Sequence, residues 1–80
     1  MDDWLQQLAA ALGVDPVDEA QITDLLDAAR DVAHTVERKV TPVATFLLGA
    51  AVQRRIGHGA RSSDALRDAL VDLRAVLPDS

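Results

Sequence analysis

The chain has 80 residues, no cysteine and a formal net charge of -5 at pH 7. A chain of this length forms one domain with one small core, and without cysteine it can hold neither a disulfide nor a thiolate zinc site. Charge is unevenly distributed, because residues 1–31 carry eight acids and one arginine, whereas residues 37–61 carry five bases and one acid. The acidic first third disfavours nucleic-acid binding, which depends on many phosphate contacts.

Two features bear on location. The N-terminal stretch MDDWLQQLAAALG is acidic where a secretory signal peptide is basic. The longest apolar run, residues 43–52, is about half as long as the ~20 residues of a membrane-spanning helix. We therefore expect a cytoplasmic protein with no membrane and no nucleic-acid partner.

Turn signals divide the chain into four helical stretches, which predicts an all-α fold: a compact four-helix bundle with short loops, forming a single domain over residues 1–80. The first helix is expected from about Asp3 to Leu12, with Gly13 as its stop. At 100° per residue its apolar side chains share one face that should pack on the core: Trp4, Leu5, Leu8, Ala11 and Leu12. Asp15-Pro16 then marks a turn.

The second helix is expected from about Gln21 to Lys39 and has a narrow apolar arc. That arc contains Ile22, Leu25, Leu26, Ala29, Ala33 and Val36, with Val32 at its edge. Thr41-Pro42 predicts the start of the third helix, with threonine as cap and proline at the first helical position. Because this helix is apolar on nearly every side, we expect it to be central, with Phe46 and Leu47 buried.

The fourth helix is expected from about Ser63 to Leu77, between a serine cap and Pro78. Ser62 or Ser63 would provide the cap. Its apolar face contains Leu66, Ala69, Leu70, Leu73 and Val76. Four helices with such faces suffice to enclose one core.

The polar side of the second helix is the first candidate site. We call it the polar stripe, and it consists of Arg30, Asp31, His34, Glu37 and Arg38. One interpretation is a solvated face whose ion pairs, spaced three or four residues apart, contribute only a few tenths of a kcal/mol each. The other is a recognition face for a protein or a phosphorylated ligand, since arginine forks bind anions and histidine changes charge near neutrality.

The second candidate site is the segment from Arg54 to Ser63, where basic side chains surround Gly57 and Gly59 ahead of a helix N-terminus. Its candidate anion-binding residues are Arg54, Arg55, His58, Arg61, Ser62 and Ser63. Helix N-termini and glycine backbone can hold phosphate. Ordinary helix capping explains the same residues.

Catalytic and metal patterns are missing from the sequence. His34 and Glu37 provide two ligands where zinc needs three or four. The chain has no Gly-x-Ser-x-Gly elbow, no Walker loop and no prosthetic serine in an Asp-Ser-Leu context. An exposed basic recognition helix is also missing, because the third helix is apolar. We expect no catalytic activity, no metal and no cofactor.

Three stretches resemble a small bacterial domain of unknown function: MDDWLQQLAAALGVD, LLDAARDVAHTVERKVTPVATFLLGAAV, and a glycine-rich turn before the last helix. The resemblance covers nearly the whole chain. It is carried by Trp4, Leu25, Arg30, Asp31, Ala33, His34, Glu37, Pro42, Thr45, Phe46, Leu47 and Gly49. Members of that family occur alone or joined to molybdopterin-guanine dinucleotide biosynthesis protein A, the molybdenum cofactor guanylyltransferase, and near formate dehydrogenase. This chain lacks the transferase domain, so the resemblance implies only an accessory role.

We therefore expect a non-catalytic accessory or adaptor domain that binds a protein partner through the polar stripe. The resemblance implies that this partner is the molybdenum cofactor guanylyltransferase or a molybdoenzyme such as formate dehydrogenase. The sequence leaves open whether the chain forms a homodimer. The alternative is a small-ligand module that binds a nucleotide or pterin phosphate with the Arg54–Ser63 segment.

Overall fold

The computed structural model describes residues 2–78, and their secondary structure is helical without a β-strand. The elements are α1 (Asp2–Leu12), α2 (Glu19–Thr35), the short 3-10 helix η1 (Arg38–Val40), α3 (Thr41–Gly57) and α4 (Ser62–Ala75). The predicted all-α class with four helices is confirmed.

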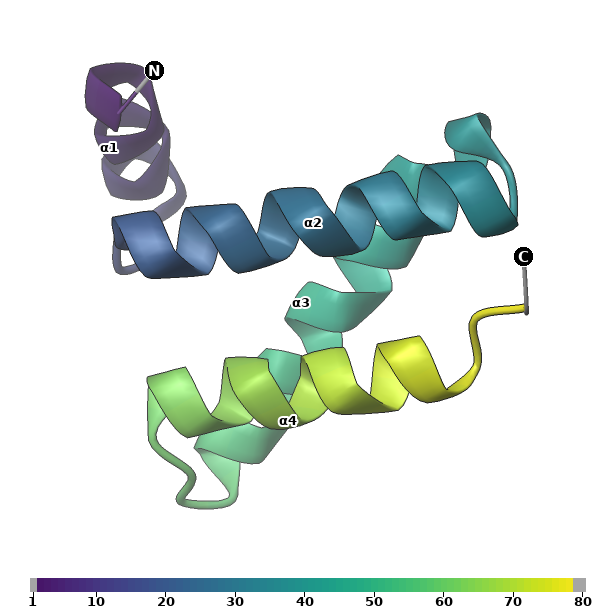
Figure 1. Cartoon of the computed structure of the whole chain (residues 1–80). Coiled ribbons are helices and arrows are strands. Elements are labelled where there is room, and N and C mark those ends of the chain that lie inside the picture. The colour runs from purple at the N-terminus through teal and green to yellow at the C-terminus, as the bar shows by residue number, and fades with distance from the viewer. Residues whose placement is uncertain (1, 79–80) are drawn as a thin grey trace.

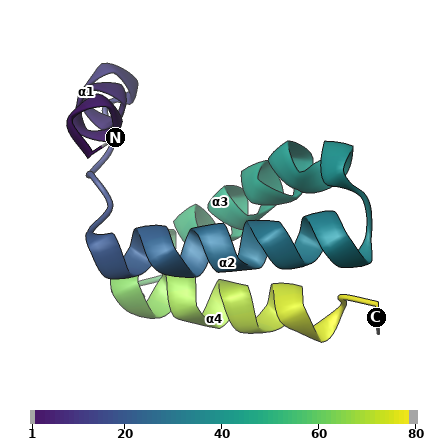
Figure 2. The same cartoon turned by 45° about the horizontal axis from the view of Figure 1, so that its top comes forward.

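Three of the helices form the core. In Figure 1, α2 and α4 run in the same direction, and α3 runs back behind both and crosses each of them. The central cluster consists of Ala28 from α2, Leu48 from α3, and Leu66, Ala69 and Leu70 from α4. Around it pack Leu25, Ala51, Val52 and Leu73. The helix α1 lies beside the beginning of α2, away from this cluster (Figure 2).

The apolar face predicted for the fourth helix is largely confirmed. Leu66, Ala69 and Leu70 are buried and Leu73 is half-buried. Val76 is exposed, because α4 ends at Ala75 and the next residue no longer follows the helical repeat. The predicted serine cap is not formed, since Arg61 is the N-cap residue and Ser62 and Ser63 lie within the first turn.

The second helix begins with a capping box that the sequence analysis did not identify. The backbone N–H of Gln21 donates to Asp18 Oδ1 at 2.8 Å, and the backbone N–H of Asp18 donates to Gln21 Oε1 at 3.0 Å. These reciprocal bonds satisfy two backbone donors that a helix start leaves free. They place the first residue of α2 at Glu19.

The predicted end of this helix at Lys39 is wrong by four residues. The last residue of α2 is Thr35, and Glu37 is extended (φ -165°, ψ 138°) before η1 begins. Because α3 starts at Thr41, the chain must reverse direction before that residue, and helix connections need about 2–8 residues. Thr41 is therefore helical and provides no side-chain cap.

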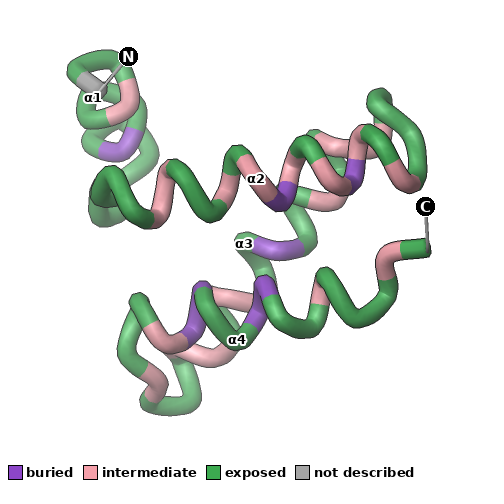
Figure 3. The backbone as a smooth tube through the Cα atoms, in the orientation of Figure 1, coloured by how far each residue is buried: buried purple, intermediate pink, exposed green. Residues whose placement is uncertain are grey.

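The buried side of α2 also differs from the predicted arc. Ala28 and Val32 are buried and Leu25 is half-buried, whereas Leu26 and Val36 are exposed. The helix is thus rotated so that the line Leu25–Ala28–Val32 faces α3 and α4. Figure 3 shows the buried segments of α2, α3 and α4 on the sides where these helices approach one another.

Candidate functional site

The outer side of α3 exposes large apolar side chains. Phe46 is 76% exposed and Leu47 is 62% exposed, so the prediction that both are buried is wrong. At 100° per residue, Val43, Phe46, Leu47 and Ala50 share an arc of about 100°. We call these four residues the outer face of α3, and all four are exposed. The buried Leu48 lies on the opposite side and packs in the core.

The first helix exposes a second apolar surface. Trp4 is 60% exposed, Leu12 is 66% exposed, and Leu8 is exposed as well. These three residues recur every fourth position, and we call them the α1 stripe. The prediction that this side of the helix packs on the core is wrong, since among residues 3–12 only Ala9 is buried and only Leu5 is half-buried. Leu5 instead lines an open hollow of about 310 Å³ with Pro16, Val17 and Ile22.

The total accessible surface gives the scale of this exposure. The chain has 6081 Å² of accessible surface and a mass of 8.6 kDa. A compact monomer of that mass exposes about 4,700 Å², so the excess is about 1,400 Å². Contiguous exposed apolar patches larger than a few hundred Å² mark interaction sites on folded proteins. The outer face of α3 and the α1 stripe each place three or four exposed apolar side chains on one side of a helix.

The polar stripe does not remain one continuous surface. Arg30 and His34 are exposed on α2, whereas Glu37 and Arg38 follow the end of that helix. Arg30 pairs with Asp27 on its own helix at 3.6 Å, and Glu37 pairs with Lys39 at 3.4 Å. Exposed pairs of this kind contribute little to stability. The structure therefore keeps Arg30 and His34 together and separates Glu37 and Arg38 from them.

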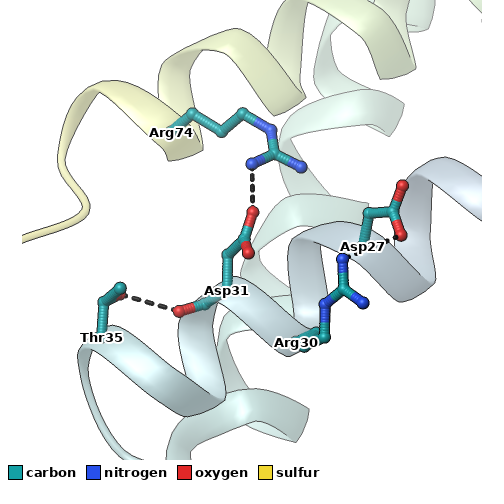
Figure 4. Close-up of polar contacts among 5 residues, drawn as sticks. All are labelled: Asp27, Arg30, Asp31, Thr35 and Arg74. Carbon is teal, nitrogen blue, oxygen red and sulfur yellow. Dashed lines mark hydrogen bonds and ion pairs between the residues drawn. The ribbon is translucent and has the colours of Figure 1, made fainter. Parts of the chain in front are cut away.

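Asp31 has a different role from its neighbours in the polar stripe. Figure 4 shows Arg74 of α4 donating to the carboxylate of Asp31 on α2, while Thr35 Oγ1 donates to the Asp31 carbonyl at 2.8 Å. The hydrogen bond from Arg74 lowers the pKa of Asp31, and the charges of Arg74, Arg30 and His34 act in the same direction. Asp31 thus joins two helices. Because Arg74 lies 43 positions along the chain, no local pattern could have identified this partner.

Half of the predicted anion-binding residues meet in one hollow between α3 and α4. This open hollow of about 660 Å³ is lined by Arg54, Arg55 and His58, with Asp68 from α4. Arg55 forms an ion pair with Asp72, which partly neutralises it. The other predicted residues, Arg61, Ser62 and Ser63, are exposed and do not line the hollow. An anion bound in this hollow would contact Arg54 and His58, and it would not contact the N-terminus of α4.

No group of three or more His, Asp or Glu side chains in residues 2–78 is arranged to hold a metal ion. Nor does this part of the chain contain a helix with the length and hydrophobicity needed to cross a bilayer.

Comparison with known proteins assigns the family. A family model described as a domain of unknown function, DUF6457, matches residues 1–80. The chain belongs to this family. No curated protein and no solved structure matches it. The family match covers every candidate surface described above, including the outer face of α3, the α1 stripe and the hollow.

Proposed function

We propose that this DUF6457 chain is a non-catalytic accessory domain that binds protein partners. The observation that carries the proposal is the outer face of α3, where Phe46 and Leu47 are 76% and 62% exposed. Aromatic side chains such as phenylalanine are enriched in the cores of protein interfaces, and Leu47 extends the apolar surface beside Phe46. Their burial by a partner would remove the unfavourable contact with water.

Arg30 and His34, which stay together on α2, are the second part of the proposed recognition surface, and Arg38 of η1 is a separate basic contact. Their exposure allows contact with an acidic partner, and arginine forms two-pronged hydrogen bonds with carboxylates. From the family resemblance, we propose the molybdenum cofactor guanylyltransferase or a molybdoenzyme such as formate dehydrogenase as the partner. A cytoplasmic location is part of this proposal.

The test measures binding of the purified chain to each of these two enzymes from the same host. The test variant is a triple variant that combines Arg30→Ala, His34→Ala and Arg38→Ala. We expect it to keep the melting temperature of the original chain, because each surface substitution changes the free energy of unfolding by about 0.5 kcal/mol or less. Binding should weaken more than about tenfold, since arginine anchors contribute on the order of 2 kcal/mol. The matched control is Arg67→Ala, an exposed arginine on α4 paired only with its neighbour Asp64.

The proposal fails if neither enzyme binds the chain, or if the triple variant and Phe46→Glu both bind as tightly as the original chain. A triple variant that unfolds would instead show that these side chains support the fold. The melting curve separates the two results.

The second candidate function is binding of a nucleotide or pterin phosphate. It is favoured by the hollow that brings Arg54, Arg55 and His58 together. GTP should then raise the melting temperature in proportion to the logarithm of its concentration, as a ligand of the native state does. Arg54→Gln should abolish the shift and Arg61→Gln, outside the hollow, should retain it. No shift at millimolar GTP and low salt would rule this function out.

A further inference from the structure

The chain exposes two apolar helix surfaces that its own fold does not cover. One is the α1 stripe and the other is the outer face of α3. Both are narrow: Trp4, Leu8 and Leu12 span an arc of about 80° on α1, and the outer face spans about 100° on α3. Their lengths also match, since Trp4 to Leu12 and Val43 to Ala50 each rise about 10–12 Å along the helix axis. Two such surfaces can pack as one helix pair.

The charges around the two surfaces are of opposite sign. Helix α1 contains two aspartates and no basic residue. Helix α3 contains Arg54 and Arg55 and no acid, and Arg38 and Lys39 precede it in η1. Arg55 pairs with Asp72 and Lys39 with Glu37, so Arg54 and Arg38 carry the positive charge of this region. On the helical repeat, Arg54 lies within about 20° of Val43, at the end of the outer face. An α1 helix placed on this face would bring acidic and basic groups together, which speeds association and selects the partner.

The chain exposes more surface, polar and apolar together, than a compact monomer of its mass, and the excess is larger than one side of a standard interface. A standard interface buries about 800 Å² on each partner, and the chain exposes about 1,400 Å² more than a compact monomer of 8.6 kDa. Within one chain, α1 is joined to the beginning of α2 by the connecting segment, and Leu5 lines an open hollow with Pro16 and Val17. No other part of the same chain therefore covers the α1 stripe or the outer face of α3.

We propose that the chain forms a two-fold symmetric dimer in which the α1 stripe of each copy covers the outer face of α3 of the other. This inference rests on the proposed function and narrows it, because it assigns the outer face of α3 to a second copy and leaves the exposed side of α2 for the enzyme partner. Both surfaces lie on one chain, so a two-fold axis uses each of them once per copy and closes the assembly. Arg30 and His34 belong to α2 and stay available to a further partner.

The experiment is sedimentation equilibrium of the full chain and three variants across a range of concentrations. The original chain should reach twice the monomer mass of 8.6 kDa. Trp4→Glu and Phe46→Glu each damage both contacts of their own dimer, so each should weaken self-association by more than about 100-fold. Val71→Glu is the matched control, because Val71 is 61% exposed on α4 and lies outside both surfaces; it should dimerise normally. Circular dichroism checks that each variant keeps its helices.

A mixture of Trp4→Glu and Phe46→Glu tests the pairing itself. The mixed dimer retains one intact contact, between α1 of the Phe46→Glu chain and α3 of the Trp4→Glu chain. Dimers should therefore form in the mixture at concentrations where each variant alone is monomeric. If Phe46→Glu alone dimerised, α1 would pair with α1; if Trp4→Glu alone dimerised, α3 would pair with α3. Either result overturns the proposal.

A chain that stays at 8.6 kDa at every concentration also overturns the dimer. The proposed function is tested separately, since binding of a molybdenum-cofactor enzyme to such a monomer would leave that function standing. Conversely, a dimer that binds neither enzyme would support the pairing of α1 with α3 and contradict the proposed function as an adaptor for those enzymes.

Discussion

The apolar faces of α4 and α1 have the same kind of spacing and opposite surroundings. On α4, Leu66 and Leu70 recur after four residues and are buried against α2 and α3. On α1, Trp4, Leu8 and Leu12 recur after four residues and are exposed. The spacing of apolar residues therefore identifies which side of a helix is apolar. It does not show whether that side is covered by another helix of the same chain or by a partner.

Helix α3 shows the same contrast between two adjacent residues. Leu48 is 6% exposed in the core, and Leu47 is 62% exposed on the outer face. The two side chains differ by one helical step of about 100°. One helix can thus serve the core on one side and a partner on the other.

The largest expected effect would test this contrast on a single helix. Leu48→Ala should reduce the free energy of unfolding by about 2–5 kcal/mol, because it removes buried methyl groups and leaves a cavity. Leu47→Ala should cost about 0.5 kcal/mol or less in the monomer, because it creates no cavity. Urea unfolding of both variants at low protein concentration measures the difference. Equal losses would mean that α3 has no outer face.

A smaller effect is expected where α1 and α2 meet. Asp18→Ala removes the capping box with Gln21 and should cost about 0.5–2 kcal/mol. Asp15→Ala, an exposed aspartate three residues earlier, is the control and should be nearly neutral. A thermal melt distinguishes them. If the two variants melted alike, the capping box would not stabilise the start of α2.

The smallest effect concerns the Asp31–Arg74 contact between α2 and α4. The pKa of Asp31 is lower than its ordinary value of 3.8, so folding favours the ionised carboxylate. Its contribution to stability is therefore complete above pH 3.8 and is lost as the pH falls through the lower folded pKa. The original chain should lose slightly more stability than Asp31→Asn over that window, measured by urea unfolding. If the two proteins lost the same stability as the pH fell, the Asp31–Arg74 contact would not contribute to the free energy of unfolding.

The sequence was sufficient for the class of fold and for the buried face of α4, because that helix has one apolar side and polar residues elsewhere. It was insufficient for α3, since a helix that is apolar nearly all round contains no signal for its rotation. The end of α2 was misplaced because the helical pattern continues through Glu37 and Arg38, while the backbone must already turn toward Pro42. Local spacing also could not place Arg54 and His58 beside Asp68 of α4.

The most direct test of the proposed dimer, in which α1 of each copy covers α3 of the other, uses the fluorescence of Trp4, the single tryptophan of the chain. Its side chain is mostly exposed in one copy and would be enclosed by α3 of the second. The emission of the original chain should shift to shorter wavelength as protein concentration rises, and that of Phe46→Glu should stay at the solvent-exposed position. Emission that is independent of concentration in both proteins would contradict the account.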